Sequence, residues 1–251
     1  MQRTILLSLV GSMVVPVALG LAVARSGDNT AAKLEEPTSI RALYGFKPVA
    51  ALSTRSTALL LVDFQNEFFT GKLPLPDARP ALARAVALSN FARASGIRVV
   101  HVSNVVNRAN SPLFAQNSVG AGPVRELAPR VEDWRITKSM AGAFSHTDLD
   151  QRLREQGIDT LIVAGLMTHL AVTVTANDAN VLGYRVLVAA DATATRTLPA
   201  ARAKSSIEPT PRLNRAIVDA RILQTAALAA LADRAAEVLP TQEILALPLQ
   251  P

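Results

Sequence analysis

Two charged side chains and one sharp turn follow apolar runs in this chain, and each could take part in chemistry. Asp63 directly follows the apolar run 57–62, and Lys138 follows the short run 134–137. A carboxylate at the end of a buried strand is costly unless it is paired or used. The segment 165–171 passes from an apolar run through a turn into a helical pattern, and a helix N-terminus offers N–H groups to a carboxylate, a phosphate or an oxyanion. The structural alternatives are a cap or salt bridge for Asp63 and a solvent-facing side chain for Lys138.

Alternating apolar and amphipathic stretches predict the elements that position these groups. The β-branched and apolar runs favour strands, and the periodic stretches that end at Gly favour helices. Strands are expected at 57–62, 97–102, 134–137, 159–164 and 184–190, and helices at 78–94, 147–155, 168–182 and 222–236. Continuous apolar strands between helices predict a mainly parallel sheet in a three-layer α/β/α sandwich, with its ligand at the carboxyl ends of the strands.

Composition narrows the class of protein. The chain has 251 residues, of which 49% are hydrophobic and 18% are charged, so a disordered or collagen-like chain is excluded. It contains no cysteine, which excludes a disulfide scaffold, a thiolate metal site and a cysteine nucleophile. The net charge is +6, but the arginines are scattered and aromatic residues make up 4%. We therefore expect a solvated basic surface and no nucleic-acid partner.

The first 24 residues differ from the rest. Arg3 precedes an almost wholly apolar run, and Ala22 and Ala24 are the small residues of a cleavage site. This pattern predicts a secretory signal peptide over 1–24, hence export, most simply to a bacterial periplasm. An uncleaved anchor is the alternative, and it is the sole expected membrane contact. Residues 25–54 are expected to form an arm or linker, 55–245 the domain and 246–251 a tail.

The order and spacing of five segments resemble the isochorismatase-like, or cysteine hydrolase, family. The matching segments are Leu60–Phe68, Lys138 with Ala143–Leu149, Gly157–His169, Thr175–Ala179 and Gly183–Thr195. The resemblance spans about 55–245. It implies the α/β/α fold, a small-molecule substrate, no cofactor and a homo-oligomer.

The resemblance also implies roles for individual residues. Asp63 is the acid/base, Lys138 lies against it, and a cis peptide between Leu166 and Met167 helps to form the oxyanion hole. The family's cysteine nucleophile falls at position 171, which is Ala171 here. A methyl group cannot attack a carbonyl, and no base is evident beside the hydroxyl of Thr168 or Thr173.

Three interpretations remain open. The first is a thiol-independent hydrolase of the vinyl-ether type, with Asp63 as general acid. This requires burial to raise the pKa of Asp63 more than Lys138 lowers it. The second is an inactive family member that binds a small molecule in the cell envelope, and the third is a cysteine amidohydrolase whose nucleophile has been replaced.

Other residues are assigned on weaker grounds. Thr168 and His169 are expected to line the substrate pocket with Phe68, Phe114 and Phe144, although core packing is an equal alternative for each Phe. His101 and His146 are expected to be structural, and the histidines show no spacing for a metal site.

Overall fold

The computed structural model describes residues 37–108, 110–200 and 217–251. The predicted signal peptide and the first part of the predicted arm lie outside these residues. The compact unit runs from Thr38 to Pro251. No helix within the described ranges is long and apolar enough to cross a membrane.

A six-stranded parallel sheet forms the centre of the unit, and its strand order is β4-β3-β2-β5-β6-β9. The strands are β2 (Thr57–Val62), β3 (Arg98–Asn104), β4 (Trp134–Lys138), β5 (Thr160–Leu166), β6 (Arg185–Ala194) and β9 (Glu237–Leu239). Every residue of β2 and β5 is buried. Such continuously apolar strands are stable where helices cover both faces of the sheet.

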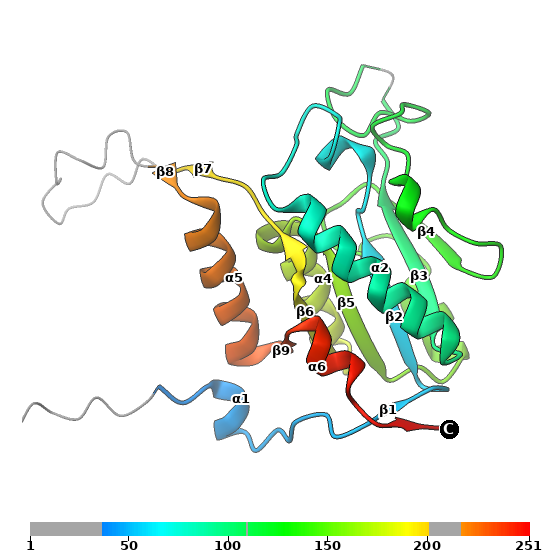
Figure 1. Ribbon diagram of the computed structural model, residues 1–251, viewed down its shortest axis with the longest axis vertical. Helices are drawn as coiled ribbons and strands as arrows, with labels where there is room; N and C mark the ends of the chain where they lie inside the picture. Colours follow the sequence, from blue (N-terminus) through cyan, green and yellow to red (C-terminus); the bar gives the residue numbers. More distant parts are fainter. Residues whose placement is uncertain (1–36, 109, 201–216) are drawn as a thin grey trace, which may run out of the picture. The chain divides into compact units, whose positions relative to one another are not determined.

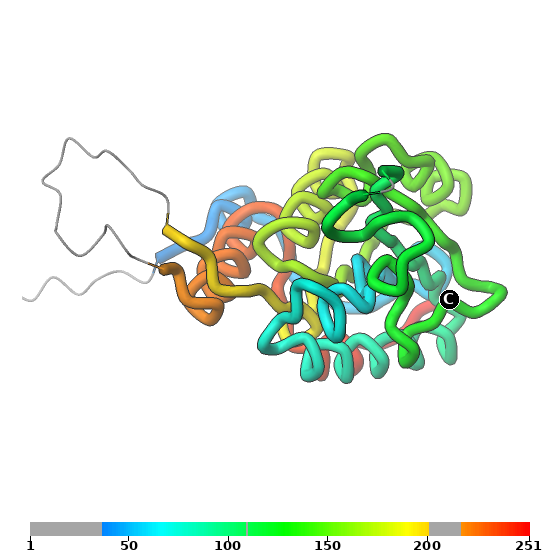
Figure 2. The backbone as a smooth tube through the Cα atoms, turned by 90° about the horizontal axis from the view of Figure 1, so that it is seen from above, coloured from blue at the N-terminus to red at the C-terminus, as the bar shows by residue number. Residues whose placement is uncertain are grey.

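Helices cover the two faces, as Figures 1 and 2 show from two directions. The helices are α1 (Ile40–Leu43), α2 (Ala78–Ala94), α3 (Leu149–Glu155), α4 (Thr173–Val181), α5 (Ala220–Arg234) and α6 (Thr241–Leu245). On one face, α2 and α6 pack in a cluster that includes Leu59, Leu88 and Ile244. On the other face, α3, α4 and α5 pack in a cluster that includes Leu60 and Leu153. The predicted α/β/α sandwich is confirmed.

Short elements complete the described chain. Single helical turns lie at η1 (Asn66–Phe68), η2 (Arg125–Leu127) and η3 (Thr168–Val172), and the minor strands are β1 (Leu52–Ser53), β7 (Leu198–Pro199), β8 (Ile217–Val218) and β10 (Leu249–Gln250). The predicted 168–182 helix divides into η3, which is one turn of π-helix, and α4. The strand expected at 184–190 runs on to Ala194 after a shift in its register with β5.

Candidate active site

The carboxyl ends of three strands bring the predicted charged pair together. Asp63 directly follows β2, while Lys138 is the last residue of β4. Strand β3 lies between them, and the Lys138 side chain reaches across it, so that Nζ donates to Asp63 Oδ2 at 2.7 Å. The Asp63 side chain is 5% exposed and that of Lys138 is 1% exposed. The pair is therefore removed from water, where its mutual attraction is strong.

Burial dominates the protonation of Asp63. Desolvation raises its pKa to about 6, although the charge and the hydrogen bond of Lys138 act to lower it. The Asn104 N–H also acts to lower the pKa of Asp63, but its hydrogen bond is made to Gln65 Oε1, at 2.9 Å. Within the described residues, Asp63 Oδ1 is buried and has no hydrogen-bond partner. One carboxyl oxygen is thus fixed by Lys138, and the other is available to carry a proton.

Lys138 is held by two acceptors. Besides Asp63, its ammonium donates to the Met140 carbonyl at 3.2 Å. These contacts use two of its three N–H donors. The ammonium therefore has a fixed direction, as a group that orients a catalytic carboxyl needs.

The turn after β5 has the conformation that the sequence predicts. The peptide bond between Leu166 and Met167 is cis. The Met167 carbonyl accepts the N–H groups of Leu170 at 3.1 Å and Val172 at 3.2 Å. These two bonds tighten the chain into the π-helical turn η3, which begins at the carboxyl edge of the sheet.

Ala171 lies in η3 and presents no nucleophile. Ala171 is 4% exposed and packs in the same apolar cluster as Ala143 and Val172. The neighbouring hydroxyls already donate elsewhere: Thr168 Oγ1 donates to Gln224 Oε1, and Thr173 Oγ1 donates to the Thr168 carbonyl, each at 2.6 Å. Neither threonine has an activating base at that bond.

Sequence reasoning missed the residues that hold η3 in place. Gln224 of α5 accepts from Thr168, and its amide donates to Thr193 Oγ1 at 2.8 Å. His169 Nδ1 contacts Thr195 Oγ1. The His169 pKa is lowered by burial and by the charge of Arg196, which favours the neutral ring. Gln224 gives no local sequence signal, because its partners lie more than thirty residues away in the chain.

The predicted aromatic residues do not gather at one place. Phe68 and Phe114 meet edge to face with ring centroids 5.3 Å apart, in the cluster on the α2 face. Phe144 instead stacks on Tyr184 at 5.8 Å and packs on the opposite cluster, which includes Ala171. Phe144 thus lies on the same face of the sheet as Ala171, and the other two rings lie on the α2 face.

A hollow of about 260 Å³ adjoins the residues that hold η3. Thr193, Thr195 and Gln224 form part of its wall, and Asp77 and Asp191 also line it. Alanine and proline side chains supply most of the remaining wall. The hollow is large enough for a small organic molecule.

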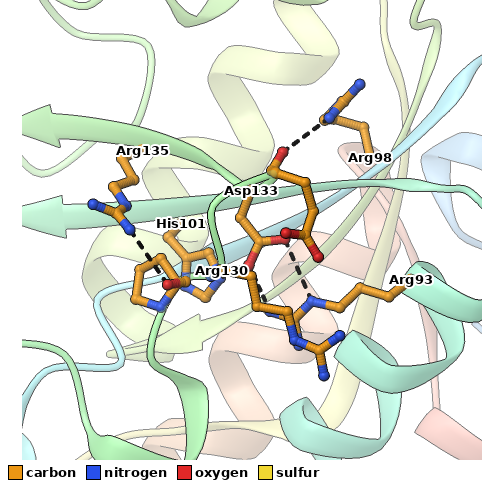
Figure 3. A network of polar contacts seen from close by, with 8 residues as sticks. Arg93, Arg98, His101, Arg130, Asp133 and Arg135 are labelled. Atoms are coloured by element: carbon orange, nitrogen blue, oxygen red, sulfur yellow. Dashed lines mark hydrogen bonds and ion pairs between the residues drawn. The ribbon is translucent and has the colours of Figure 1, made fainter.

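His101 belongs to a separate polar network, shown in Figure 3. Its Nε2 lies 3.1 Å from Asp133 Oδ2, and Arg93 Nη2 lies 2.6 Å from the same oxygen. The pKa of His101 is lowered by burial, although Asp133 acts to raise it. This network joins α2, β3 and the segment before β4 and therefore has a structural role. The described residues hold no group of three or more His, Cys, Asp or Glu side chains that could bind a metal ion.

Known proteins share this architecture and sequence pattern. Residues 57–243 match the isochorismatase domain model. The chain is 33% identical over 175 residues to the streptothricin hydrolase of Streptomyces noursei, covering 67% of this chain and 66% of that protein. It is 32% identical over 162 residues to the secreted isochorismatase effector Isc1 of Verticillium dahliae, covering 64% and 84%. An isochorismatase structure from Pseudomonas putida KT2440 matches with a TM-score of 0.73 at 29% identity, covering 83% of this chain and 99% of that one.

Proposed function

The chain belongs to the isochorismatase family, and from this premise we propose that it hydrolyses a small vinyl ether without a thiol nucleophile. The observation that carries the proposal is Asp63. Its carboxyl is buried, its pKa is raised to about 6, and Oδ1 has no partner in the described chain. A raised pKa near the working pH is what a general acid requires.

The chemistry follows from the two carboxyl oxygens. Protonated Asp63 gives its proton from Oδ1 to the terminal carbon of the vinyl ether, which leaves an oxocarbenium ion. Water adds to that ion and gives one proton back to the Asp63 carboxylate, which regenerates the acid, and the resulting hemiketal breaks down to a ketone and an alcohol. The carboxylate left on Asp63 is stabilised by Lys138 Nζ, 2.7 Å from Oδ2. No step needs an attacking atom at Ala171.

Binding without turnover is the second candidate function. The observation that favours it is Ala171, which places a methyl group where family hydrolases of the cysteine type carry their nucleophile. In that case a small ligand would bind at the carboxyl edge of the sheet without being converted, and Asp63→Asn would change its affinity alone. The predicted signal peptide, cleaved or kept as an anchor, would place either activity outside the cytoplasm.

The test is turnover of isochorismate, simple amides and simple imides by the purified protein and two variants. Asp63→Asn removes the acid, and Asp148→Asn removes a carboxylate whose side chain is 61% exposed. We expect vinyl-ether cleavage that Asp63→Asn abolishes and Asp148→Asn retains.

Two results would contradict the proposal. Cleavage of amides alone, unchanged by Asp63→Asn, would indicate a different catalytic group. No turnover of any compound would favour the binding function. Because Asp63→Asn leaves the buried Lys138 without its counter-ion, the double variant Asp63→Asn, Lys138→Met is measured as well, and circular dichroism checks its fold.

A further inference from the structure

A second buried carboxylate, Glu67 of η1, has no charged partner in the part of the chain that the structure describes. Glu67 is 4% exposed. Its Oε1 accepts the Lys72 N–H at 2.6 Å. Across the described ranges, the ion pairs within 4 Å involve other carboxylates, and no hydrogen bond is made to Oε2. An ammonium or another N–H donor that reaches Oε2 would therefore gain a charge-assisted hydrogen bond.

Two glycines make room for this carboxylate. A Cβ at Gly120 would lie 2.1 Å from Glu67 Oε2, and a Cβ at Gly71 would lie 2.9 Å from Oε1. The Gly71 Cβ would also lie 2.5 Å from the Glu67 Cα, so a side chain at Gly120 would displace the carboxylate and one at Gly71 would clash with the backbone as well. The Glu67 N–H donates to the Gly120 carbonyl at 2.9 Å, which fixes the two segments against each other. An apolar side chain at position 67 would need no ion partner. The chain instead places a carboxylate in this space.

Glu67 lines a hollow of about 160 Å³ between η1 and the segment that follows β3. The other residues that line it include Gly71, Lys72, Ser111, Phe114, Ser118 and Gly120. Ser111 donates its hydroxyl hydrogen to the Leu113 carbonyl at 2.6 Å, so its oxygen is left as an acceptor. Ser118 Oγ already accepts the Ala121 N–H at 3.2 Å.

We propose that this hollow binds the primary ammonium group of a small ligand. The ammonium offers three N–H donors, and the wall supplies the Glu67 carboxylate and the Ser111 oxygen as acceptors. Phe114 lines the same hollow and supplies apolar wall for the hydrocarbon part of such a ligand. Charge-assisted hydrogen bonds to a desolvated carboxylate are the strong ones. The site is separate from the Asp63–Lys138 pair and does not depend on the reaction proposed there.

An inorganic cation and Lys72 are the two competing occupants. Hard metal ions need several oxygen ligands, whereas Glu67 is the one carboxylate among the residues of this wall. Lys72 is exposed, and its ammonium makes no ion pair in the described chain. Its positive charge at the rim repels an incoming ammonium, so removing that charge is expected to strengthen binding.

The experiment is a calorimetric titration of the whole protein with n-butylammonium chloride at constant ionic strength. Glu67→Gln removes the charge and keeps an acceptor for the Lys72 N–H. Glu126→Gln is the matched control, because Glu126 is an exposed glutamate that pairs with Arg79 on the surface. Losing a charge-assisted bond is expected to weaken binding about tenfold or more.

The proposal expects saturable binding that Glu67→Gln weakens and Glu126→Gln preserves, with Lys72→Gln equal to or tighter than the unchanged protein. If Glu67→Gln fails to fold, Ser111→Ala tests the same hollow and is expected to weaken binding several-fold. Equal binding by Glu67→Gln or Ser111→Ala would overturn the site. Equal binding of potassium, or of tetramethylammonium, which has no N–H, would overturn the assignment to a primary ammonium.

Discussion

At Asp63 two opposing effects act on one carboxyl group. Burial raises its pKa to about 6, and Lys138 acts in the other direction. At pH 7 about a tenth of the molecules carry the proton on this group. If the protonated form does the chemistry, activity is present below pH 6 and declines as the pH rises through 6. We expect kcat/KM to fall about tenfold for each pH unit well above this value, which a pH-rate profile measures.

Lys138 influences the pH at which activity begins to decline. In Lys138→Met, both effects that Lys138 exerts on Asp63 disappear, and the burial remains. The pKa of Asp63 then rises further, so the decline of activity moves to higher pH even if the maximal rate is lower. The pH-rate profile of Lys138→Met shows whether the decline of activity moves to higher or to lower pH. A decline at lower pH than in the unchanged protein would contradict the role assigned to Lys138.

A cysteine introduced at position 171 would be the only thiol of the chain, because the sequence contains no cysteine. Its reactivity can therefore be measured without interference. In Ala171→Cys, the new thiol lies at the start of a helix and on the same edge of the sheet as Lys138. Both features act to lower a thiol pKa below its ordinary value of about 8.5, whereas the apolar surroundings of residue 171 act to raise it, and we expect the lowering to prevail. The rate of alkylation by iodoacetamide as a function of pH reports this pKa. The matched control is Ala230→Cys on the exposed side of α5. If the thiol at position 171 has the same pKa as the thiol of Ala230→Cys, the site has lost more than its nucleophile.

At the scale of elements, α5 fixes the turn that forms the site. Gln224 joins Thr168, which is fully buried, to Thr193, which is 5% exposed. In Gln224→Leu the buried Thr168 hydroxyl loses its acceptor, and the Thr193 oxygen loses a donor while its hydroxyl still donates to the Ala190 carbonyl at 2.8 Å. We expect the free energy of unfolding to fall by about 1–3 kcal/mol, measured by urea denaturation.

The control for Gln224→Leu is Gln151→Leu. Gln151 is exposed on α3 and bonds Glu155 one turn away. Its loss is expected to change stability by about 0.5 kcal/mol or less. Equal losses in the two variants would show that Gln224 has no special function in holding η3.

The sequence predicts the elements with strong periodicity better than the contacts between them. The run 57–62 and the periodic stretch 78–94 coincide with β2 and α2. The Asp63–Lys138 pair is predictable from the family resemblance, because both residues end parallel strands. The π-helical turn, the bond from Thr168 to Gln224 and the burial of the Glu67 carboxylate beside Gly120 depend on long-range packing. A pattern in a single sequence does not record such contacts.

At the scale of the whole molecule, many of the positively charged arginines pack against other side chains at the surface. Six arginines of the described chain lie over aromatic rings: Arg41, Arg79, Arg98, Arg152, Arg154 and Arg234. Others pair with aspartates, as Arg84 does with Asp191 and Arg93 with Asp133. Guanidinium groups that stack on rings cover apolar surface while staying in contact with water. The described arginines that stack or pair in this way therefore contribute to the packing of the surface.

The two ends of the compact unit are joined to each other through the strands β1 and β10. In β1, Leu52 is fully buried and pairs with Leu249 of β10, with the Leu52 N–H donating to the Pro248 carbonyl at 2.8 Å. Part of the segment predicted as an arm therefore packs into the core. We expect Leu52→Ala to lower the free energy of unfolding by about 2–5 kcal/mol, as for other buried leucines. Leu249→Ala, at a residue that is 43% exposed, is the control and is expected to cost about 0.5 kcal/mol or less. Urea denaturation of both variants decides: a small loss for Leu52→Ala would mean that the segment before β2 is dispensable for folding.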